Sequence, residues 1–452
     1  MITSDKFNPD LKAIKKVYIE TYGCQMNFSD SEIVASLMQD EGYEISGESK
    51  DADVVLVNTC SIRDNAEQRV RKRLRELKAL KKNNPFLKIG VIGCMAERLK
   101  EQLLEEEQSV DLIVGPDAYR DLPALLDKVE EGQKAINVIL STKETYSDIT
   151  PVRLDKNGVT AFISIMRGCE NFCAYCVVPF TRGKERSRDV KTIIQEARDL
   201  FENGYREVTL LGQNVNSYFR EDDGKQTSFY ELLEQVAAVS PQLRVRFATS
   251  HPKDISDELL KAIGKHHNIC NAIHLPVQSG SNNILSLMKR KYTREWYLDR
   301  IAAIRKYIPG CAISTDIIAG FCTEKDEDHR DTISLMNRVG YDYAFMFKYS
   351  ERPGTIAQKK LDDDVPESVK SERLQEIIDL QQQLSHASNK RDIGKTFEVL
   401  AEGFSKKSAD FLMGRNSQNK VVVFPKGNYN KGDYLNVKIN DCTPATLIGT
   451  AT

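Results

Sequence analysis

Short apolar runs alternate with amphipathic segments over the first third of the chain. The runs KVYIE, DVVLVN, KIGVIG and VDLIVG are almost continuously hydrophobic, which is typical of buried parallel strands. The segments between them have helical spacing, as in the one that places Ile33, Val34, Leu37 and Met38 on one face. Repeated strand–helix units predict an α/β domain with a parallel sheet over residues 15–132.

The alternation continues over residues 155–386. The expected strands there are TAFISIM, EVTLLG, RVRFATS, AIHLPV, AISTDIIAGF and YAFMFKYS. About six strand–helix units predict a partial (β/α)6 barrel, in which functional groups gather at the carboxyl ends of the strands. A long polar helix at about residues 366–391 is expected to be a scaffold that closes this domain.

The last segment, residues 388–452, has a different pattern. Its short strands, FEVLAEGF, FLMGR, KVVVFP and YLNVKI, are separated by turn residues, which predicts a small all-β barrel or sandwich. The segment contains ten Lys or Arg and six Asp or Glu. This basic excess suits a solvated surface and an RNA-binding barrel equally well.

Composition narrows the class of protein. The 452 residues include 64 Lys or Arg and 66 Asp or Glu, so any basic surface for nucleic acid must be local. No apolar run approaches the ~18 to 20 residues of a membrane span, and the first 20 residues lack the apolar segment of a secretory signal. We therefore expect a cytoplasmic protein with no membrane partner. The ten cysteines are then core residues, redox thiols or metal ligands rather than disulfides.

Three of the cysteines follow three successive strands of the first domain. Cys24, Cys60 and Cys94 lie 36 and 34 residues apart, each just past the end of its strand. Because parallel strands end at one edge of the sheet, the three thiols are predicted to converge there. The alternative is three small hydrophobic residues at strand ends, but three in register favour a metal site.

Three more cysteines form a CxxxCxxC motif directly after the first barrel strand. Cys169, Cys173 and Cys176 suit zinc or an iron–sulfur cluster. Zinc normally needs a fourth protein ligand, and the nearest histidine, His251, is 75 residues beyond Cys176. A four-iron cluster held by three cysteines leaves one iron open to bind S-adenosylmethionine (SAM), whereas an electron carrier usually has four cysteines.

A CxxxCxxC motif that opens a βα barrel resembles the radical SAM superfamily. The segments TYGCQMNFSDSE, NTCSIRDNAEQRV and VIGCMAE are similar to the N-terminal domain of the methylthiotransferases. Their radical SAM core is matched by GCENFCAYCVVPFTRGKERSR, LLGQNVNSY, HLPVQSGS and FKYSERPGT, and the C-terminal barrel resembles their TRAM domain, an RNA-binding module. The resemblance covers roughly residues 15–452.

The branch of the family is indicated by GCQMN and CVVPFTRG. They most resemble the enzymes that convert N6-isopentenyladenosine at position 37 of tRNA to its 2-methylthio derivative. The alternatives within the family act on threonylcarbamoyl-adenosine in tRNA or on an aspartate of a ribosomal protein. The alternative from another class is a non-enzymatic RNA-binding or iron–sulfur electron-transfer protein.

The resemblance implies two [4Fe–4S] clusters, with Cys169, Cys173 and Cys176 holding the SAM-binding one and Cys24, Cys60 and Cys94 an auxiliary one. One SAM would methylate a sulfur carried by the auxiliary cluster, and a second would give the radical that removes hydrogen from C2 of adenine. Both clusters would then face one cavity. No catalytic residue is expected beyond the clusters. The implied partners are a tRNA anticodon loop and an electron donor such as flavodoxin or ferredoxin. The resemblance does not indicate the sulfur donor. Nothing in the sequence requires an oligomer, so a monomer is expected.

Further site residues follow from the same resemblance. Polar residues at the strand ends are candidate SAM contacts, with capping of strands or loops as their alternative role: Gln213, Asn214, Gln278, Ser314 and Asp316. Basic residues near the cluster motif and in the last domain are candidate RNA contacts, with plain solvation as the alternative: Arg182, Lys184, Arg186, Arg188, Lys406, Lys407, Arg415 and Lys420.

One segment departs from the family pattern. Where the family usually has GFPGE, this chain has Gly320-Phe321-Cys322-Thr323-Glu324. The loss of Pro and Gly changes the backbone options of a loop near the SAM site. Cys322 is interpreted as an incidental thiol rather than an extra ligand. The remaining thiols lack partnered spacing and are interpreted as structural: Cys270, Cys311 and Cys442.

Overall fold

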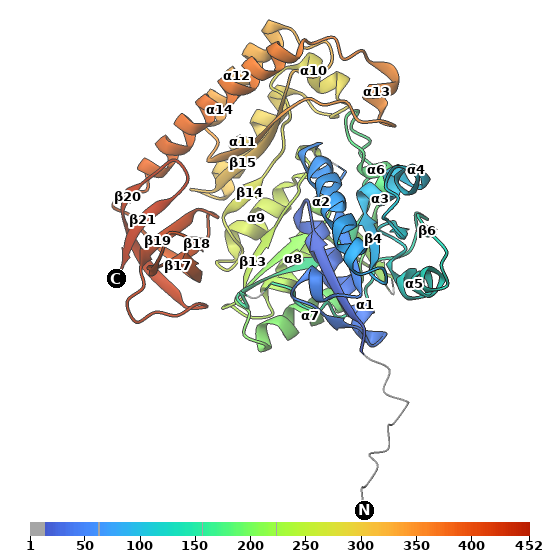
Figure 1. Cartoon of the computed structure of the whole chain (residues 1–452). Helices are drawn as coiled ribbons and strands as arrows, with labels where there is room; N and C mark the ends of the chain where they lie inside the picture. Colours follow the sequence, from blue (N-terminus) through green and yellow to red (C-terminus); the bar gives the residue numbers. More distant parts are fainter. Residues whose placement is uncertain (1–13, 62–63, 156, 223) are drawn as a thin grey trace, which may run out of the picture. The chain divides into compact units, whose positions relative to one another are not determined.

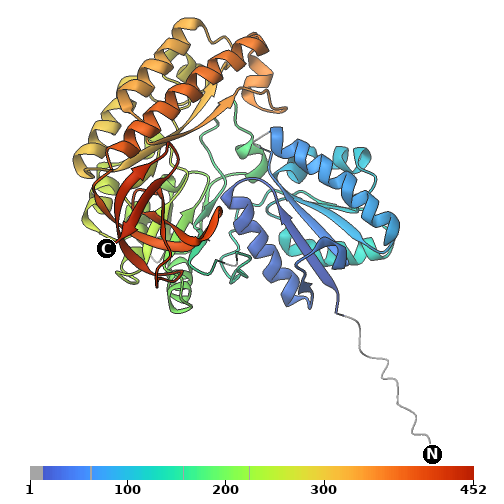
Figure 2. The same ribbon diagram turned by 60° about the vertical axis from the view of Figure 1, so that its left-hand side comes forward.

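The computed structural model describes the chain except residues 1–13, 62–63, 156 and 223. It divides into two compact units, which meet in sequence between Leu154 and Asp155. Figures 1 and 2 show the elements of each unit. No helix in the part of the chain that the structure describes is long and apolar enough to cross a membrane.

The first unit is a parallel sheet with helices on both faces. Its strands are β1 (Lys16–Thr21), β2 (Glu44–Ile45), β3 (Val54–Thr59), β4 (Lys88–Gly93), β5 (Leu112–Val114) and β6 (Ala135–Asn137). Its helices are α1 (Gln25–Asp40), α2 (Asp64–Asn83), α3 (Cys94–Leu99), α4 (Glu101–Glu106) and α5 (Leu122–Glu130), with 3₁₀ turns η1 (Ser49–Asp51) and η2 (Tyr119–Asp121). The strand order is β2-β1-β3-β4-β5-β6, and every pairing is parallel. Helices α1 and α5 contribute to the core on one face, and α2, α3 and α4 to the core on the other.

The second unit begins with the incomplete barrel. Its strands are β7 (Thr160–Ser164), β10 (Glu207–Leu211), β13 (Arg244–Phe247), β14 (Ala272–His274), β15 (Ala312–Ala319) and β16 (Tyr343–Lys348), with short pairs β8 (Met166–Arg167) with β9 (Arg186–Ser187) and β11 (Phe219–Asp222) with β12 (Lys225–Ser228). The helices are α6 (Val178–Arg182), α7 (Val190–Glu202), α8 (Phe229–Ala237), α9 (Asp257–Lys265), α10 (Asn282–Leu287), α11 (Arg294–Tyr307), α12 (Asp326–Val339), α13 (Ile356–Lys360) and α14 (Glu367–Lys390), with 3₁₀ turns η3 (Val215–Ser217) and η4 (Pro252–Asp254). The six principal strands form two parallel groups, β13-β10-β7 and β14-β15-β16, which a parallel bridge between Val245 and Ile269 connects. The predicted partial barrel is confirmed.

The C-terminal part of the second unit is a closed five-stranded barrel. Its strands are β17 (Thr396–Ser405), β18 (Ser408–Asn416), β19 (Val421–Pro425), β20 (Tyr434–Cys442) and β21 (Leu447–Ala451). It contacts the amino-terminal ends of strands in the incomplete barrel: Arg244 donates to the Arg415 carbonyl at 2.7 Å, and Arg246 donates to the Asn416 carbonyl at 2.7 Å. The Tyr434 hydroxyl donates to the Arg206 carbonyl at 2.9 Å. The opposite, carboxyl ends of the strands remain available for chemistry.

The long helix α14 packs along β16. Its buried face is largely polar. Lys370 and Arg373 are buried, at 3% and 7% exposure. Lys370 binds Asp363 at 2.6 Å, and Arg373 donates to the Glu324 carbonyl at 2.9 Å and to its carboxylate at 3.0 Å. The scaffold helix therefore holds the loop after β15 by charge-assisted hydrogen bonds as well as by apolar packing.

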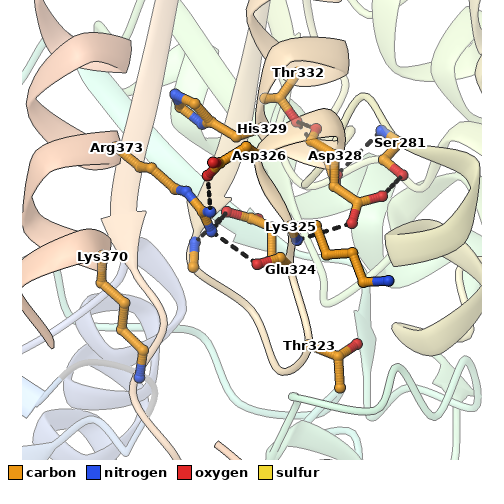
Figure 3. A network of polar contacts seen from close by, with 12 residues as sticks. Ser281, Thr323, Glu324, Lys325, Asp326, Asp328, His329, Thr332, Lys370 and Arg373 are labelled. Carbon is orange, nitrogen blue, oxygen red and sulfur yellow. Dashed lines mark hydrogen bonds and ion pairs between the residues drawn. The ribbon is translucent and has the colours of Figure 1, made fainter. Parts of the chain in front are cut away.

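Figure 3 shows this loop, which contains the departure from the family pattern. The Glu324 carboxylate also accepts from the Gly320 N–H at 2.9 Å, which closes the turn. Cys322 is fully buried in an apolar cluster with Phe321 and Tyr349, so its surroundings fit a packing role. Thr323 has φ +62°, a left-handed conformation in which a β-branched residue is strained.

We expect Thr323→Gly to raise the free energy of unfolding by about 0.5–1 kcal/mol. The left-handed conformation destabilises a folded non-glycine residue by about 1–2 kcal/mol. Glycine removes this strain, but its greater backbone freedom in the unfolded chain offsets roughly half of the gain. Equilibrium denaturation of the full chain measures the change. Thr323→Ala, which keeps the Cβ, is the control; an equal gain in that variant would show that backbone strain is not the cause.

Candidate functional site

The first cysteine trio lies at the carboxyl edge of the first sheet, at the ends of adjacent strands β1, β3 and β4. Pairing of Thr59 with Gly93 brings the residues before Cys60 and Cys94 side by side. A Cβ on Gly23 would lie 2.3 Å from the Cβ of Cys60, so the chain next to Cys24 touches Cys60 directly. Cys60 and Cys94 are buried, and Cys24 is partly exposed. The register thus places the trio at neighbouring strand ends, as the spacing predicts.

Buried amide side chains fix these strand ends. The Asn27 side-chain amide donates to the Thr59 carbonyl at 2.8 Å, and the Asn58 amide donates to the Asn27 carbonyl at 2.8 Å. The Thr59 hydroxyl donates to the Ile92 carbonyl at 2.7 Å. These bonds link α1, β3 and β4 beneath the cysteines, so the thiols sit on rigid elements.

A buried carboxylate, Glu97, lies one helical turn after Cys94 on α3. It is 1% exposed, and neither carboxylate oxygen accepts a hydrogen bond within the part of the chain that is described. Burial is the main cause that raises its pKa to about 7, and the ammonium of Lys100, 3.6 Å away, offsets this in part. Sequence reasoning missed this group, although the segment CMAER carries an acid at the start of a helix that enters the core.

The second trio occupies the loop between β8 and α6. A Cβ on Gly168 would lie 1.9 Å from the Lys184 carbonyl oxygen, and its φ is +81°, so glycine is required directly before Cys169. The Cys169 N–H donates to the Gly183 carbonyl at 3.1 Å. The Cys169 thiol accepts from the Asn171 amide at 3.6 Å, and burial raises its pKa to about 11. A neutral buried thiol of this kind becomes a thiolate when a metal binds it.

Arg290, which follows α10, reaches the same loop. It is 3% exposed, and its Nη1 donates to the Cys173 sulfur at 3.2 Å. Its Nη2 donates to the Pro276 carbonyl at 2.7 Å and its Nε to the Tyr292 hydroxyl at 2.9 Å. No sequence signal singled it out, because it lies 117 residues from Cys173 in a Lys- and Arg-rich run.

The five candidate SAM contacts divide between structural and open positions. Gln213 accepts from the Gly168 N–H at 2.5 Å, so it supports the cysteine loop. Asn214 is 1% exposed and binds Asp254 and the His251 N–H. Gln278 is also buried, with φ +72°.

Ser314 and Asp316 are the open members of the set. They share one face of β15, both are partly exposed, and His274 contacts Ser314 at 3.0 Å and Asp316 at 3.4 Å. Their side chains therefore present polar groups on the inside of the barrel.

An aromatic row on β16 continues this face. Tyr343 pairs with Ser314 and Phe345 with Asp316 in register. Tyr343 is 52% exposed and Phe345 40% exposed, and their rings meet edge to face at 4.9 Å. Exposed aromatic side chains beside polar groups can stack a flat ligand. The alternation in YAFMFK predicts a strand, but it does not by itself indicate a stacking surface.

The candidate RNA contacts are also divided. The resemblance suggests Arg182, Arg186 and Arg188 as RNA contacts, with plain solvation as the alternative, but all three are buried. The guanidinium of Arg188 binds Glu196 and the Ser164 carbonyl. Because these partners hold it inside the protein, Arg188 is a structural residue.

Lys420 likewise serves the fold. It binds Asp392 at 2.7 Å and Ser388 at 2.9 Å, and its side chain is 11% exposed. Lys184, Lys406 and Lys407 are exposed, and Arg415 is partly exposed. Near the two lysines of the β17–β18 turn, Phe404 is 55% exposed with Lys426 5.1 Å from its ring centre. Basic and aromatic side chains thus occur together on this barrel.

Comparison with known proteins identifies three matching families along the chain. Residues 16–115 match Uncharacterized protein family UPF0004, residues 163–336 the Radical SAM superfamily, and residues 390–452 the TRAM domain. A tRNA-2-methylthio-N(6)-dimethylallyladenosine synthase of Parabacteroides distasonis is 58% identical, with 96% of this chain and 95% of the relative covered. A protein of the same name from Phocaeicola vulgatus is 59% identical over the same shares.

Solved structures share the fold at low sequence identity. A radical S-adenosylmethionine methyltransferase from Kitasatospora setae, with tryptophan substrate and a SAM analogue, has a TM-score of 0.57 and 14% identity, covering 76% of this chain and 75% of its own. A cobalamin-dependent S-adenosylmethionine radical enzyme has a TM-score of 0.54 and 12% identity, covering 82% and 56%. These similarities concern the fold alone.

Proposed function

We propose a reaction for this chain on the basis that it belongs to the tRNA-2-methylthio-N(6)-dimethylallyladenosine synthase family of radical SAM enzymes. It is a methylthiotransferase that converts N6-isopentenyladenosine in tRNA to the 2-methylthio derivative, with SAM and [4Fe–4S] as cofactors. The finer proposals are a second cluster, position 37 in the anticodon loop, and domains at 15–132, 155–386 and 388–452. The observation that carries the two-cluster proposal is the pair of cysteine trios, each at the carboxyl ends of strands.

The residues present fit an iron–sulfur cluster at each trio. Three thiols per site are soft ligands of the kind that such clusters require. No three His, Cys, Asp or Glu side chains of the described residues are placed to ligate a single metal ion. A four-iron cluster does not need that arrangement, because each thiolate binds a different iron. The buried guanidinium of Arg290 beside Cys173 also suits a negatively charged group there.

When bound, the clusters and SAM supply the electron, the 5′-deoxyadenosyl radical and the sulfur that a C–H to C–S conversion needs. The chain's own residues hold and orient the reactants. Gln213 fixes the start of the cysteine loop, and Ser314 and Asp316 offer polar groups to SAM inside the barrel. The Asn27, Asn58 and Thr59 bonds keep the other trio in place.

The aromatic row is the proposed platform for the substrate base. Phe345→Ala is expected to raise KM for isopentenylated tRNA by about 5- to 150-fold, since base–aromatic stacking is worth about 1–3 kcal/mol. Steady-state kinetics on purified tRNA measure this effect. Phe219→Ala is the control, because Phe219 is 53% exposed on the β11 strand outside the barrel. An unchanged KM in Phe345→Ala would remove this residue from the substrate site.

The C-terminal barrel is proposed to bind tRNA through its exposed lysines. The Lys406→Ala/Lys407→Ala variant should bind tRNA more weakly, and the slope of log K against log salt should fall by about 0.7–0.9 for each tRNA phosphate that a lysine no longer neutralises. Filter binding over a salt series measures the slope. Lys395→Ala, a lysine that pairs with Asp392 at 3.1 Å, is the control. Unchanged affinity and slope in the double variant would assign tRNA binding elsewhere.

Turnover decides between the family's substrates. The test is anaerobic quantification of iron and sulfide, followed by digestion of isopentenylated tRNA after reaction and detection of 2-methylthio adenosine. Eight irons per chain and 2-methylthio product support the proposal. Product only on threonylcarbamoyl-adenosine tRNA or on a ribosomal protein would favour those alternatives.

We propose that the enzyme acts as a cytoplasmic monomer that receives electrons from a flavodoxin or ferredoxin.

A further inference from the structure

The buried guanidinium of Arg290 has an unusual set of neighbours. Its hydrogen-bond acceptors are the Pro276 carbonyl, the hydroxyls of Tyr292 and Tyr175, and the sulfur of Cys173. The Tyr292 ring also lies 5.3 Å from the guanidinium carbon. All four acceptors are neutral when Cys173 is a thiol.

A buried positive charge needs a negative partner. Among the residues that the structure describes, Arg290 forms no ion pair with a carboxylate, and the groups that act on its charge are Tyr175, Tyr292 and Cys173. An uncompensated buried charge costs several kcal/mol, and proteins normally pair such groups. The neighbour that can become anionic is Cys173, as a thiolate on iron. The site is therefore completed electrostatically by the cluster that the cysteine loop binds.

We infer that Arg290 is a positioning residue that sets the reduction potential of the SAM-binding cluster. Its Nη1–H bond to the Cys173 sulfur and its buried charge both favour the more negative, reduced cluster. In the step concerned the cluster gains one electron from the reductant, and no covalent bond forms or breaks. Arg290 thus makes the cluster easier to reduce. The inference rests on the proposed function only in requiring that this cluster is present.

The reduction potential of the cluster tests the inference. The full chain is reconstituted anaerobically with iron and sulfide in a Cys24→Ala/Cys60→Ala/Cys94→Ala background, so that one cluster remains. Reduced cluster is measured by electron paramagnetic resonance in a mediated titration with dithionite. In Arg290→Gln we expect the ratio of reduced to oxidised cluster at a fixed potential to fall about tenfold, which is 59 mV for one electron. In Arg290→Lys, which keeps the charge, the ratio should fall less than threefold.

The outcomes separate the inference from the proposed function. Arg290→Gln with full iron content and an unchanged potential overturns the inference, as does a shift in Arg290→Lys as large as in Arg290→Gln. If the parent protein binds no cluster at this loop, the proposed function fails as well.

A second measurement covers the case in which Arg290→Gln does not take up iron. In pulsed electron paramagnetic resonance, wild-type protein labelled with ¹⁵N-arginine should show a ¹⁵N hyperfine coupling to the reduced cluster. The same coupling should be absent from labelled Arg290→Lys. No coupling in the wild type contradicts the assigned contact.

Discussion

Replacing Cys60 with alanine is expected to abolish methylthiolation of isopentenylated tRNA while SAM cleavage by the reduced enzyme continues. Cys60 belongs to the trio at the edge of the first sheet. In the proposed scheme, SAM cleavage depends instead on the cluster of the barrel loop. With only two cysteine thiolates left, the proposed auxiliary site cannot supply the three ligands that its cluster needs. Chromatographic assays of 5′-deoxyadenosine and of 2-methylthio nucleoside in one reaction separate the two activities.

Two further variants make this result specific. Cys173→Ala should lose both activities, because its thiolate is a proposed ligand of the cluster that binds SAM. Cys442→Ala should keep both, since Cys442 lies in the core of the C-terminal barrel. Normal product formation by Cys60→Ala would refute the two-cluster scheme, and loss of SAM cleavage in that variant would show that the two sites are not independent.

The positions of the cysteines were predictable because a continuous apolar run is a local signal of a buried strand. Continuous apolar runs identified β1, β3 and β4, and a cysteine directly after such a run must lie at the carboxyl edge of a parallel sheet. The family resemblance suggests Ser314 and Asp316 as strand-end groups, whereas they are the third and fifth residues of the eight-residue strand β15.

Burial of charged residues was not predictable in the same way. The alternating arginines after the cysteine motif suggest RNA contacts or a solvated loop, yet Arg188 is enclosed with Glu196 and the Ser164 carbonyl. Helix α14 is polar in sequence, yet it buries Lys370 and Arg373 against carboxylates from other segments. A charge is buried where a distant partner compensates it, and such partners leave no periodic trace in the sequence.

Glu97→Gln is expected to make the protein more stable than the wild type at pH 8, by about 3 kcal/mol. The folded-state pKa of Glu97 is raised to about 7 from 4.5, and each unit is worth about 1.4 kcal/mol. The folded wild type therefore binds a proton that the unfolded chain has released, so its stability falls as pH rises from about 4.5 to 7. Glutamine cannot ionise, so the variant avoids this loss.

The difference between pH 5 and pH 8 isolates the charge of Glu97. Glutamine has nearly the same shape and leaves the same buried site without hydrogen-bond partners, so any packing penalty is common to both pH values. In urea denaturation of the metal-free, reduced chain, the advantage of Glu97→Gln should grow by about 2–3 kcal/mol between pH 5 and pH 8. Glu105→Gln, an exposed position on α4, should show no such trend. A constant difference between Glu97→Gln and the wild type would mean that Glu97 ionises in the folded protein as readily as in the unfolded chain.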